Sequence, residues 1–219
     1  MISAVILAGL VYGAAALIIK LPSVPPPLAL PATGTSAPAG PLDGTWRVAA
    51  GSVAGFRVRE TALGFSNDAV GRTSAVSGVL TVSGGRVAQA TFRVDLTAVK
   101  INGKTQPQFG ISLGTQAHPI ATFTLSHPVP LGFAFASGAT VTSTAVGALA
   151  MNGVSRPATV TIRERRDGPV LRAAGSIPVQ FSAWGIKAPA GYGVFGSLAN
   201  HGIVEFSLIL DRTGNTGLS

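Results

Sequence analysis

Cysteine is absent from the 219 residues of the chain. Its absence excludes a disulfide scaffold, a zinc site with cysteine ligands, a thiol nucleophile and a lipoprotein-type acylated cysteine, and it leaves the redox compartment open. Charged residues make up only 11% of the chain, whereas 47% of its residues are hydrophobic. A disordered, highly charged protein needs the opposite balance, so that class is excluded as well.

Acidic residues and histidines are scarce, with eight and three in the chain. The acidic residues show no paired spacing, which argues against glycosidase chemistry. His118, His127 and His201 are scattered, so no metal site is expected. No G-x-S-x-G elbow occurs, and the glycine-rich stretch 185–196 lacks the strand-then-helix setting of a phosphate-binding loop. We therefore expect a protein that is not an enzyme and that needs no cofactor.

Sixteen basic residues against eight acidic ones give a formal charge of +8. This balance favours anionic partners, but the density of basic residues is too low for a nucleic-acid-binding surface. No nucleic acid is expected among the partners.

The N-terminus carries a nearly continuous apolar run over residues 2–19, followed by Lys20 and preceded by no basic residue. Its length lies at the lower edge of what spans a bilayer and exceeds the usual apolar region of a signal peptide. Residues 1–20 are predicted to be a signal anchor that contacts the membrane, with the rest of the chain outside the cytoplasm in the cell envelope. The alternative is a signal peptide that is cleaved, so that the protein is secreted.

Residues 21–42 are rich in proline, alanine, serine and threonine. Proline-rich segments are extended and semi-rigid, at roughly 3 Å per residue. This segment is predicted to be a linker that holds the following domain away from a membrane.

From residue 43 onward, apolar and polar residues alternate with the period of half-buried strands. Clear rows are Phe92, Val94 and Leu96, and Val204, Phe206, Leu208 and Leu210. Turn signals between strands are Ser83-Gly84-Gly85, Ser137-Gly138, Asn152-Gly153 and Asp167-Gly168. One short helix or irregular lid is expected within residues 104–118. Roughly eight antiparallel strands predict an all-β sandwich or a closed barrel.

The order of several motifs is similar to that of the YceI-like family. These motifs cover about four fifths of the chain and are Gly44-Thr45-Trp46, Val70-Gly71-Arg72, Phe92-Arg93-Val94-Asp95-Leu96, Ala121-Thr122-Phe123, Gly147-Ala148-Leu149, Gly175-Ser176-Ile177, Trp184-Gly185-Ile186 and Val204-Glu205-Phe206. The resemblance implies an eight-stranded antiparallel, lipocalin-like barrel with a short helical insertion over residues 43–219. It also implies a long apolar tunnel that holds a polyisoprenoid or another long-chain lipid.

One segment departs from the family pattern. The family often has an Arg-Asp pair followed by His-Leu at the insertion, whereas this chain has Lys104-Thr105-Gln106-Pro107-Gln108-Phe109. A role of that polar pair in holding a head group or ordering a lid does not transfer to this chain.

Candidate ligand-contacting residues follow from the apolar rows. The phenylalanines expected to line the tunnel are Phe56, Phe92, Phe123, Phe181 and Phe206. Trp184 lies near a strand end, where it either closes the tunnel or is a core residue. For a pyrophosphate or carboxylate head group the candidates are Arg57, Arg59 and Arg72, whose alternative is an exposed charged face.

The expected function is envelope-located binding, carriage or sequestration of a long apolar lipid. The first alternative is a non-enzymatic structural or interaction barrel that is filled by its own side chains. An enzyme acting on a lipid or a quinone is the second alternative, and it needs a polar cluster at one tunnel mouth. The sequence leaves the oligomeric state, the lipid and its head group open.

Overall fold

The alternating segments form strands in the computed structural model, which describes residues 24–32, 34, 36–62, 65–187 and 196–213. The predicted N-terminal anchor lies outside these residues. Among the described residues, no helix has the length and apolar character needed to cross a bilayer. The strands are β1 (Gly44–Val48), β2 (Val53–Ala62), β3 (Phe65–Thr73), β4 (Val76–Ser83), β5 (Arg86–Asp95), β6 (Lys100–Ile101), β7 (Ile120–Leu125), β8 (Val129–Pro130), β9 (Val141–Met151), β10 (Val154–Asp167), β11 (Val170–Gln180), β12 (Gly196–Leu198) and β13 (His201–Arg212). The helices are α1 (Pro107–Ser112) and α2 (Gly132–Ala136), with 3-10 turns η1 (Leu96–Ala98) and η2 (Phe181–Trp184).

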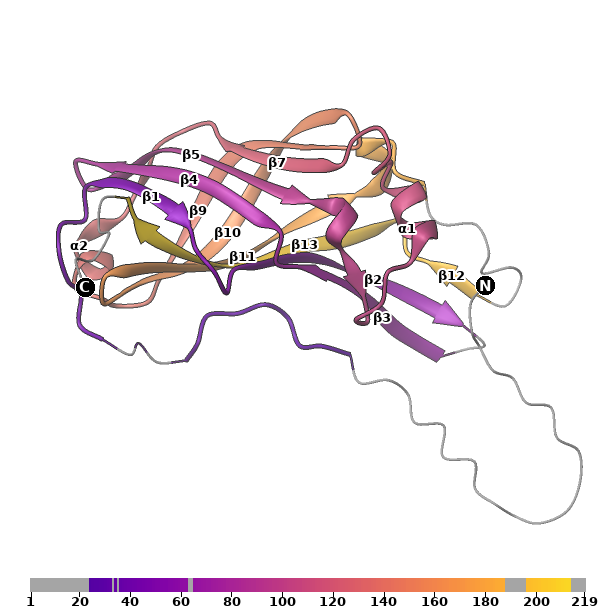
Figure 1. Ribbon diagram of the computed structural model, residues 1–219, viewed down its shortest axis with the longest axis horizontal. Helices are drawn as coiled ribbons and strands as arrows, with labels where there is room; N and C mark the ends of the chain where they lie inside the picture. The colour runs from indigo at the N-terminus through magenta and orange to yellow at the C-terminus, as the bar shows by residue number, and fades with distance from the viewer. Residues whose placement is uncertain (1–23, 33, 35, 63–64, 188–195, 214–219) are drawn as a thin grey trace, which may run out of the picture.

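Eight of these strands close into an antiparallel barrel in the order β1, β4, β5, β7, β9, β10, β11 and β13 (Figure 1). The pairing of β13 with β1 completes the ring. Residues 210–212 of β13 pair with β1, whereas residues 203–207 pair with β2. The β2–β3 ribbon therefore extends the wall along the same edge of β13. The predicted eight-stranded, lipocalin-like barrel is confirmed.

The turn chemistry matches the expected hairpins at three places. Asn152 and Gly153 join β9 to β10, and both have positive φ, at 49° and 74°. The turns at 83–85 and 167–168 join β4 to β5 and β10 to β11. Ser137 and Gly138 also form a turn, but this turn follows α2 and precedes β9 instead of joining two strands directly. The Ser137 N–H and side chain donate to carbonyls of α2, which is how a polar residue ends a helix as readily as it starts a hairpin.

The two α-helices lie at opposite ends of the barrel (Figure 1). At the α2 end, the barrel is closed by a packed cluster that includes Trp46, Phe135 and Leu210, each at most 1% exposed. The Trp46 indole N–H donates to the Leu42 carbonyl at 3.0 Å, which satisfies its one donor. At the other end, α1 confirms the helix expected within residues 104–118. Its Phe109 ring stacks on Phe56 with centroids 6.1 Å apart.

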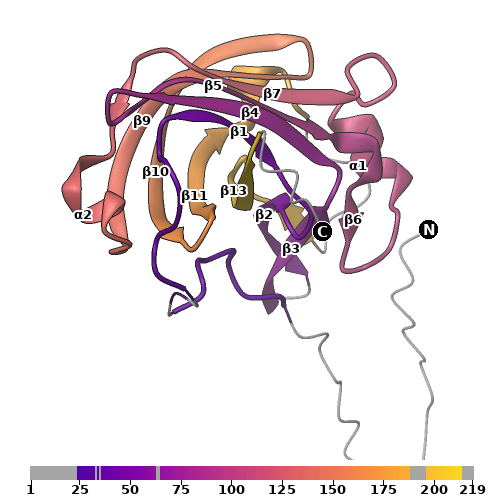
Figure 2. The ribbon, with the colours of Figure 1, turned by 60° about the vertical axis from the view of Figure 1, so that its left-hand side comes forward.

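The described residues of the segment 24–42, called the strap below, lie along the outside of the barrel (Figure 2). Proline has no N–H, so this segment offers many carbonyls and few donors. Arginines of the barrel bind these carbonyls: Arg57 Nη2 donates to Pro25 O at 2.6 Å, and Arg72 Nη2 donates to Pro26 O at 2.8 Å. The Leu28 N–H donates in return to Glu205 Oε2 at 3.1 Å.

The second half of the strap is bound to the β10–β11 turn. The Ser36 N–H donates to Asp167 Oδ1 at 3.0 Å, and the Ala39 N–H donates to the Gly168 carbonyl at 3.0 Å. Arg166 Nη2 donates to the carbonyls of Ala39 and Gly40. The sequence predicts a spacer here, but the described part of this segment is held against the barrel by charge-assisted hydrogen bonds.

Removing the strap is expected to destabilise the barrel. Chains beginning at residue 24 and at residue 43 are the matched pair, since neither contains the N-terminal run. The shorter chain exposes Arg57, Arg72, Arg166 and two carboxylates without their strap partners. We expect a loss of roughly 2 kcal/mol, or a Tm lower by about 4–8 °C. Thermal unfolding followed by circular dichroism measures the difference, and equal Tm values would show that the strap adds no stability.

Candidate functional site

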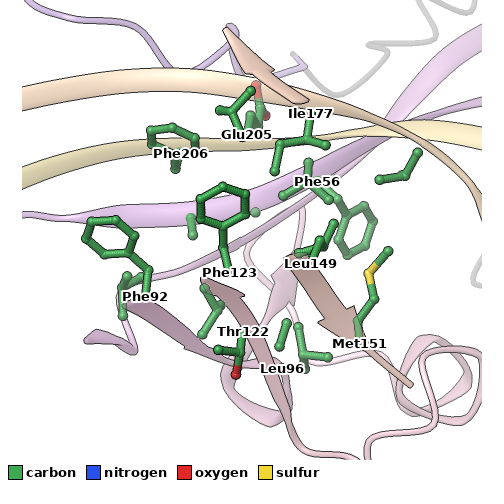
Figure 3. A pocket seen from close by; sticks show the side chains of 18 of the residues that line it. Phe56, Phe92, Leu96, Thr122, Phe123, Leu149, Met151, Ile177, Glu205 and Phe206 are labelled. Carbon is green, nitrogen blue, oxygen red and sulfur yellow. The ribbon is translucent and has the colours of Figure 1, made fainter. Parts of the chain in front are cut away.

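The barrel encloses a cavity of about 220 Å³. At roughly 10–15 Å³ for each water-sized group, it has room for more than a dozen of them. Its wall comes from β2 and from every strand of the ring except β1, together with α1, η2 and residues near them, and Figure 3 shows part of it. The wall is almost entirely apolar, with aromatic, aliphatic and alanine side chains. Such a wall suits a long apolar ligand and excludes one with many polar groups.

All five phenylalanines proposed from the sequence line this cavity: Phe56, Phe92, Phe123, Phe181 and Phe206. Figure 3 shows Phe56, Phe92, Phe123 and Phe206 grouped around the same space. Trp184 is buried in the core cluster of β9, β10 and β11 and does not line the cavity. Its indole N–H donates to Leu149 O at 3.1 Å, which fixes the ring as a core residue.

Each of these phenylalanine rings lies against a glycine of a neighbouring strand. A Cβ at Gly71 would lie 2.5 Å from Cε1 of Phe56, and one at Gly175 would lie 2.7 Å from Cζ of Phe206. Gly78, Gly147 and Gly202 stand in the same relation to Phe92, Phe123 and Phe181. The missing side chains let the rings lie close to the wall, so the centre of the barrel stays open.

Arg57, Arg59 and Arg72 lie on the outer face, because they alternate with the inward residues of β2 and β3. Arg57 and Arg59 contact Asp68 at 3.2 and 2.9 Å, and Arg72 Nη2 lies 2.7 Å from Glu205 Oε1. Burial lowers the pKa of Arg72, and the nearby Glu205 carboxylate opposes that shift. Two of the three also bind the strap. The structure therefore gives these arginines partners outside the barrel and does not place them at the cavity.

Glu164 is a polar residue of the cavity wall that was not predicted from the sequence. Val160 and Ile162 of β10 face inward, and the same period brings Glu164 inward. Glu164 is only 8% exposed. Burial raises its pKa above the ordinary value of 4.5, while Ser143 acts in the opposite direction. The signal was present in the sequence, but the charged run 163–167 hid the continuing alternation.

Phe109 and Lys187 were missed as well, and both belong to the α1 end of the cavity. Phe109 comes from the segment that departs from the family pattern, and it supplies an apolar cover where that pattern has a polar pair. Lys187 is exposed and contributes the cationic group of the described wall. In the part of the chain that the structure describes, no cluster of three or more histidine, aspartate or glutamate side chains is placed to hold a metal ion.

The family model of the YceI-like domain matches residues 46–209. The chain belongs to the YceI-like family. No curated protein matches the sequence.

Two solved structures share the fold of this family member. The polyisoprenoid-binding domain from Saccharophagus degradans, described as implicated in plant cell wall breakdown, superposes with a TM-score of 0.58 at 17% identity. The match covers 78% of this chain and 99% of that domain. BcnA of Burkholderia cenocepacia gives a TM-score of 0.54 at 17% identity, covering 70% of this chain and 95% of BcnA.

The Gly71→Ala variant tests the close contact between glycine and phenylalanine. The three atoms nearest to the new Cβ belong to the side chains of Phe56 and Val99, so Phe56 is expected to move into the cavity. Overpacking of this kind costs roughly 1–3 kcal/mol. We expect a folded barrel that takes up a fluorescent long-chain probe several-fold more weakly.

Gly175→Ala is the matched comparison, because its Cβ would also lie 2.5 Å from the Thr161 carbonyl oxygen. Backbone cannot yield as a ring does, so this variant is expected to lose more stability. Unchanged probe uptake by Gly71→Ala would contradict the role of the glycine in keeping the cavity open.

The buried carboxyl of Glu164 should make the free energy of unfolding fall as the pH rises. Because the folded-state pKa of Glu164 is raised, the unfolded chain releases this proton first. The carboxyl therefore costs stability as pH rises above about 4.5 toward and through the folded pKa, and costs nothing below that range. We expect Glu164→Gln to gain Tm relative to the parent at pH 7, and to gain less at pH 4.

Asp95 provides the control of opposite sign. Its carboxylate accepts hydrogen bonds from the Thr97 hydroxyl at 2.6 Å and the Thr97 N–H at 2.9 Å, which lower its pKa. Asp95→Asn should lose stability at pH 7 and should approach the parent as pH falls through the folded pKa. A Glu164→Gln curve parallel to the parent across this range would contradict the assignment.

Proposed function

We propose that this YceI-like protein binds and carries a long-chain apolar lipid of the polyisoprenoid type, without acting as an enzyme. The observation that carries the proposal is the cavity of about 220 Å³ inside a closed barrel, with five phenylalanines in an almost wholly apolar wall. The shared fold with a domain described as polyisoprenoid-binding supports the choice of ligand class.

Apolar area alone is enough to hold such a ligand. Each buried CH₂ contributes roughly 0.8 kcal/mol, so about ten buried carbons give about 8 kcal/mol before the cost of ordering the chain. A Kd of about 1 μM requires about 8 kcal/mol net, so a chain with well over ten buried carbons reaches it once that cost is met. Few polar contacts are then needed for affinity, and those present set the orientation of the ligand.

The proposed place of action is the cell envelope. The apolar run over residues 2–19 supports an anchor or a signal that directs the barrel out of the cytoplasm. A lipid carrier in this place shields a water-insoluble molecule between membranes or beside one.

The cavity weighs against a barrel filled by its own side chains. An enzyme on a lipid or a quinone would need several polar groups gathered at one mouth. The charged residues of the described wall are instead spread out: Lys187 lies at the α1 end, Glu164 lies toward the α2 end, and the Glu205 carboxylate is paired with Arg72 at 2.7 Å.

The deciding experiment is purification of the full chain without added lipid, followed by organic extraction and mass spectrometry. A stoichiometric isoprenoid or other long-chain species is the expected result. A folded protein that is empty and takes up neither polyprenyl nor fatty-acyl lipids would overturn the proposal and favour an interaction module.

Phe123→Asp gives the matching variant test, with Phe123→Leu as its control. An unpaired charge in the apolar wall is costly, so Phe123→Asp is expected to reduce lipid uptake at least tenfold. Phe123→Leu keeps the wall apolar and should stay within a few-fold of the parent. Circular dichroism checks that both variants fold. Undiminished uptake by folded Phe123→Asp would remove Phe123 from the binding surface.

A further inference from the structure

Glu164 lies near the packed end of the cavity. Strand β10 begins at the Asn152–Gly153 turn, beside Gly114 just after α1, and ends at Asp167 near α2. Glu164 is therefore close to the α2 end, where it pairs with Val141 of β9 and Ala173 of β11. Beyond it, the cluster around Trp46 and Phe135 closes the barrel.

Two buried oxygens in this region have no hydrogen-bond partner. They are Oε1 of Glu164 and Oγ of Ser143. Ser143 faces the same way, because it pairs with the inward residue Ile162. Ser143 lies close enough for hydrogen bonding to lower the pKa of Glu164, but Ser143 Oγ and Glu164 Oε1 each lack a partner with good hydrogen-bond geometry.

Nearby cations are committed elsewhere. Arg166 is the next inward residue of β10, and its guanidinium donates to the strap carbonyls of Ala39 and Gly40. Arg165 faces outward and donates to Pro31 O at 3.1 Å. Arg163 is exposed on the outer face. Among the described residues, no cationic side chain contacts the Glu164 carboxyl.

An unpartnered carboxyl in an apolar wall is expensive unless something polar meets it. A hydrocarbon tip leaves both oxygens without partners. A phosphate or carboxylate head group places a second negative charge beside the first. An ammonium group has three N–H donors, but the site offers it two unpartnered oxygens. Burying the ion pair that it forms with the carboxylate also costs desolvation free energy. An uncharged hydroxyl both donates and accepts, so it satisfies the site without adding charge.

We propose that Glu164 and Ser143 bind the head group of the lipid, and that this head group is an uncharged hydroxyl which enters first and reaches the packed end of the cavity. The proposal rests on the proposed function and adds the chemistry and the orientation of the ligand. The Glu164 carboxyl accepts from the hydroxyl when ionised, and donates to it when protonated.

The opposite orientation has its own candidate contact. Lys187 lines the α1 end and is exposed, so a lipid phosphate placed there would meet a cation. That arrangement puts the hydrocarbon tip against Glu164, where it desolvates the carboxyl without forming a hydrogen bond to it. Alcohol and phosphate of the same chain therefore distinguish the two orientations.

The experiment compares three probes on the delipidated full chain: geranylgeraniol, geranylgeranyl phosphate and the matching hydrocarbon. Their affinities are measured by competition against one fluorescent long-chain probe. The variants are Glu164→Leu, which removes both oxygens, and Glu164→Gln, which keeps hydrogen bonding. Asp211→Asn removes an exposed carboxylate of the outer face and is the control.

The parent is expected to bind the alcohol about tenfold more tightly than the hydrocarbon or the phosphate. Glu164→Leu should lose this preference, binding the alcohol about tenfold more weakly and the hydrocarbon more tightly. Glu164→Gln should keep the alcohol within a few-fold of the parent, and Asp211→Asn should match the parent throughout. The preference is measured as a ratio of affinities between probes. A variant that is partly unfolded binds all three probes more weakly and leaves this ratio unchanged.

Two outcomes overturn this inference while leaving the lipid-binding function in place. One is a parent that binds the phosphate at least as tightly as the alcohol. The other is a Glu164→Leu variant that changes the affinity for all three probes by the same factor. Failure of the parent to bind any of the probes would instead count against the proposed function itself.

Discussion

An eight-stranded barrel has an interior only just wide enough for its own side chains or for one small ligand. In this protein, contacts between phenylalanine rings and glycines of the adjacent strands decide whether the interior is filled or open. At Gly71 the missing side chain lets the Phe56 ring lie close to the wall, and Gly175 does the same for Phe206. The barrel therefore keeps large aromatic surfaces for contact and still retains open volume. A side chain at either glycine would push the adjacent phenylalanine ring toward the centre of the barrel and reduce the volume of the cavity.

Polar interactions are sorted by face around this apolar interior. Most charged groups of the strap region face outward, where Arg57, Arg72 and Glu205 bind one another and the proline-rich chain. Glu164 and Arg166 lie on the inward-facing side of β10, and of these two Glu164 lines the cavity. The separation explains how an arginine-rich wall can surround an apolar cavity, because neighbouring residues on a strand point to opposite faces.

Strand alternation was sufficient to predict the strands and the five wall phenylalanines, since that pattern records which face each residue occupies. It left a sandwich or a barrel open, and the resemblance of the motifs to the YceI-like family decided for the barrel. Alternation was not sufficient for contacts between distant segments. The docking of the strap depends on arginines of β2, β3 and β10 meeting proline carbonyls more than thirty residues away. Trp184 was ambiguous because a tryptophan at a strand end suits both a core and a tunnel mouth. Its hydrogen bond to Leu149 O makes it a core residue.

Docking of the strap also shortens the segment that connects the N-terminal run to the barrel. Counted from Lys20, the chain is already attached to the barrel at Pro25, only five residues on. Five extended residues reach roughly 18 Å, whereas a free segment up to residue 42 would reach several times farther. With the N-terminal run held in a bilayer as proposed, the barrel stays close to the membrane surface.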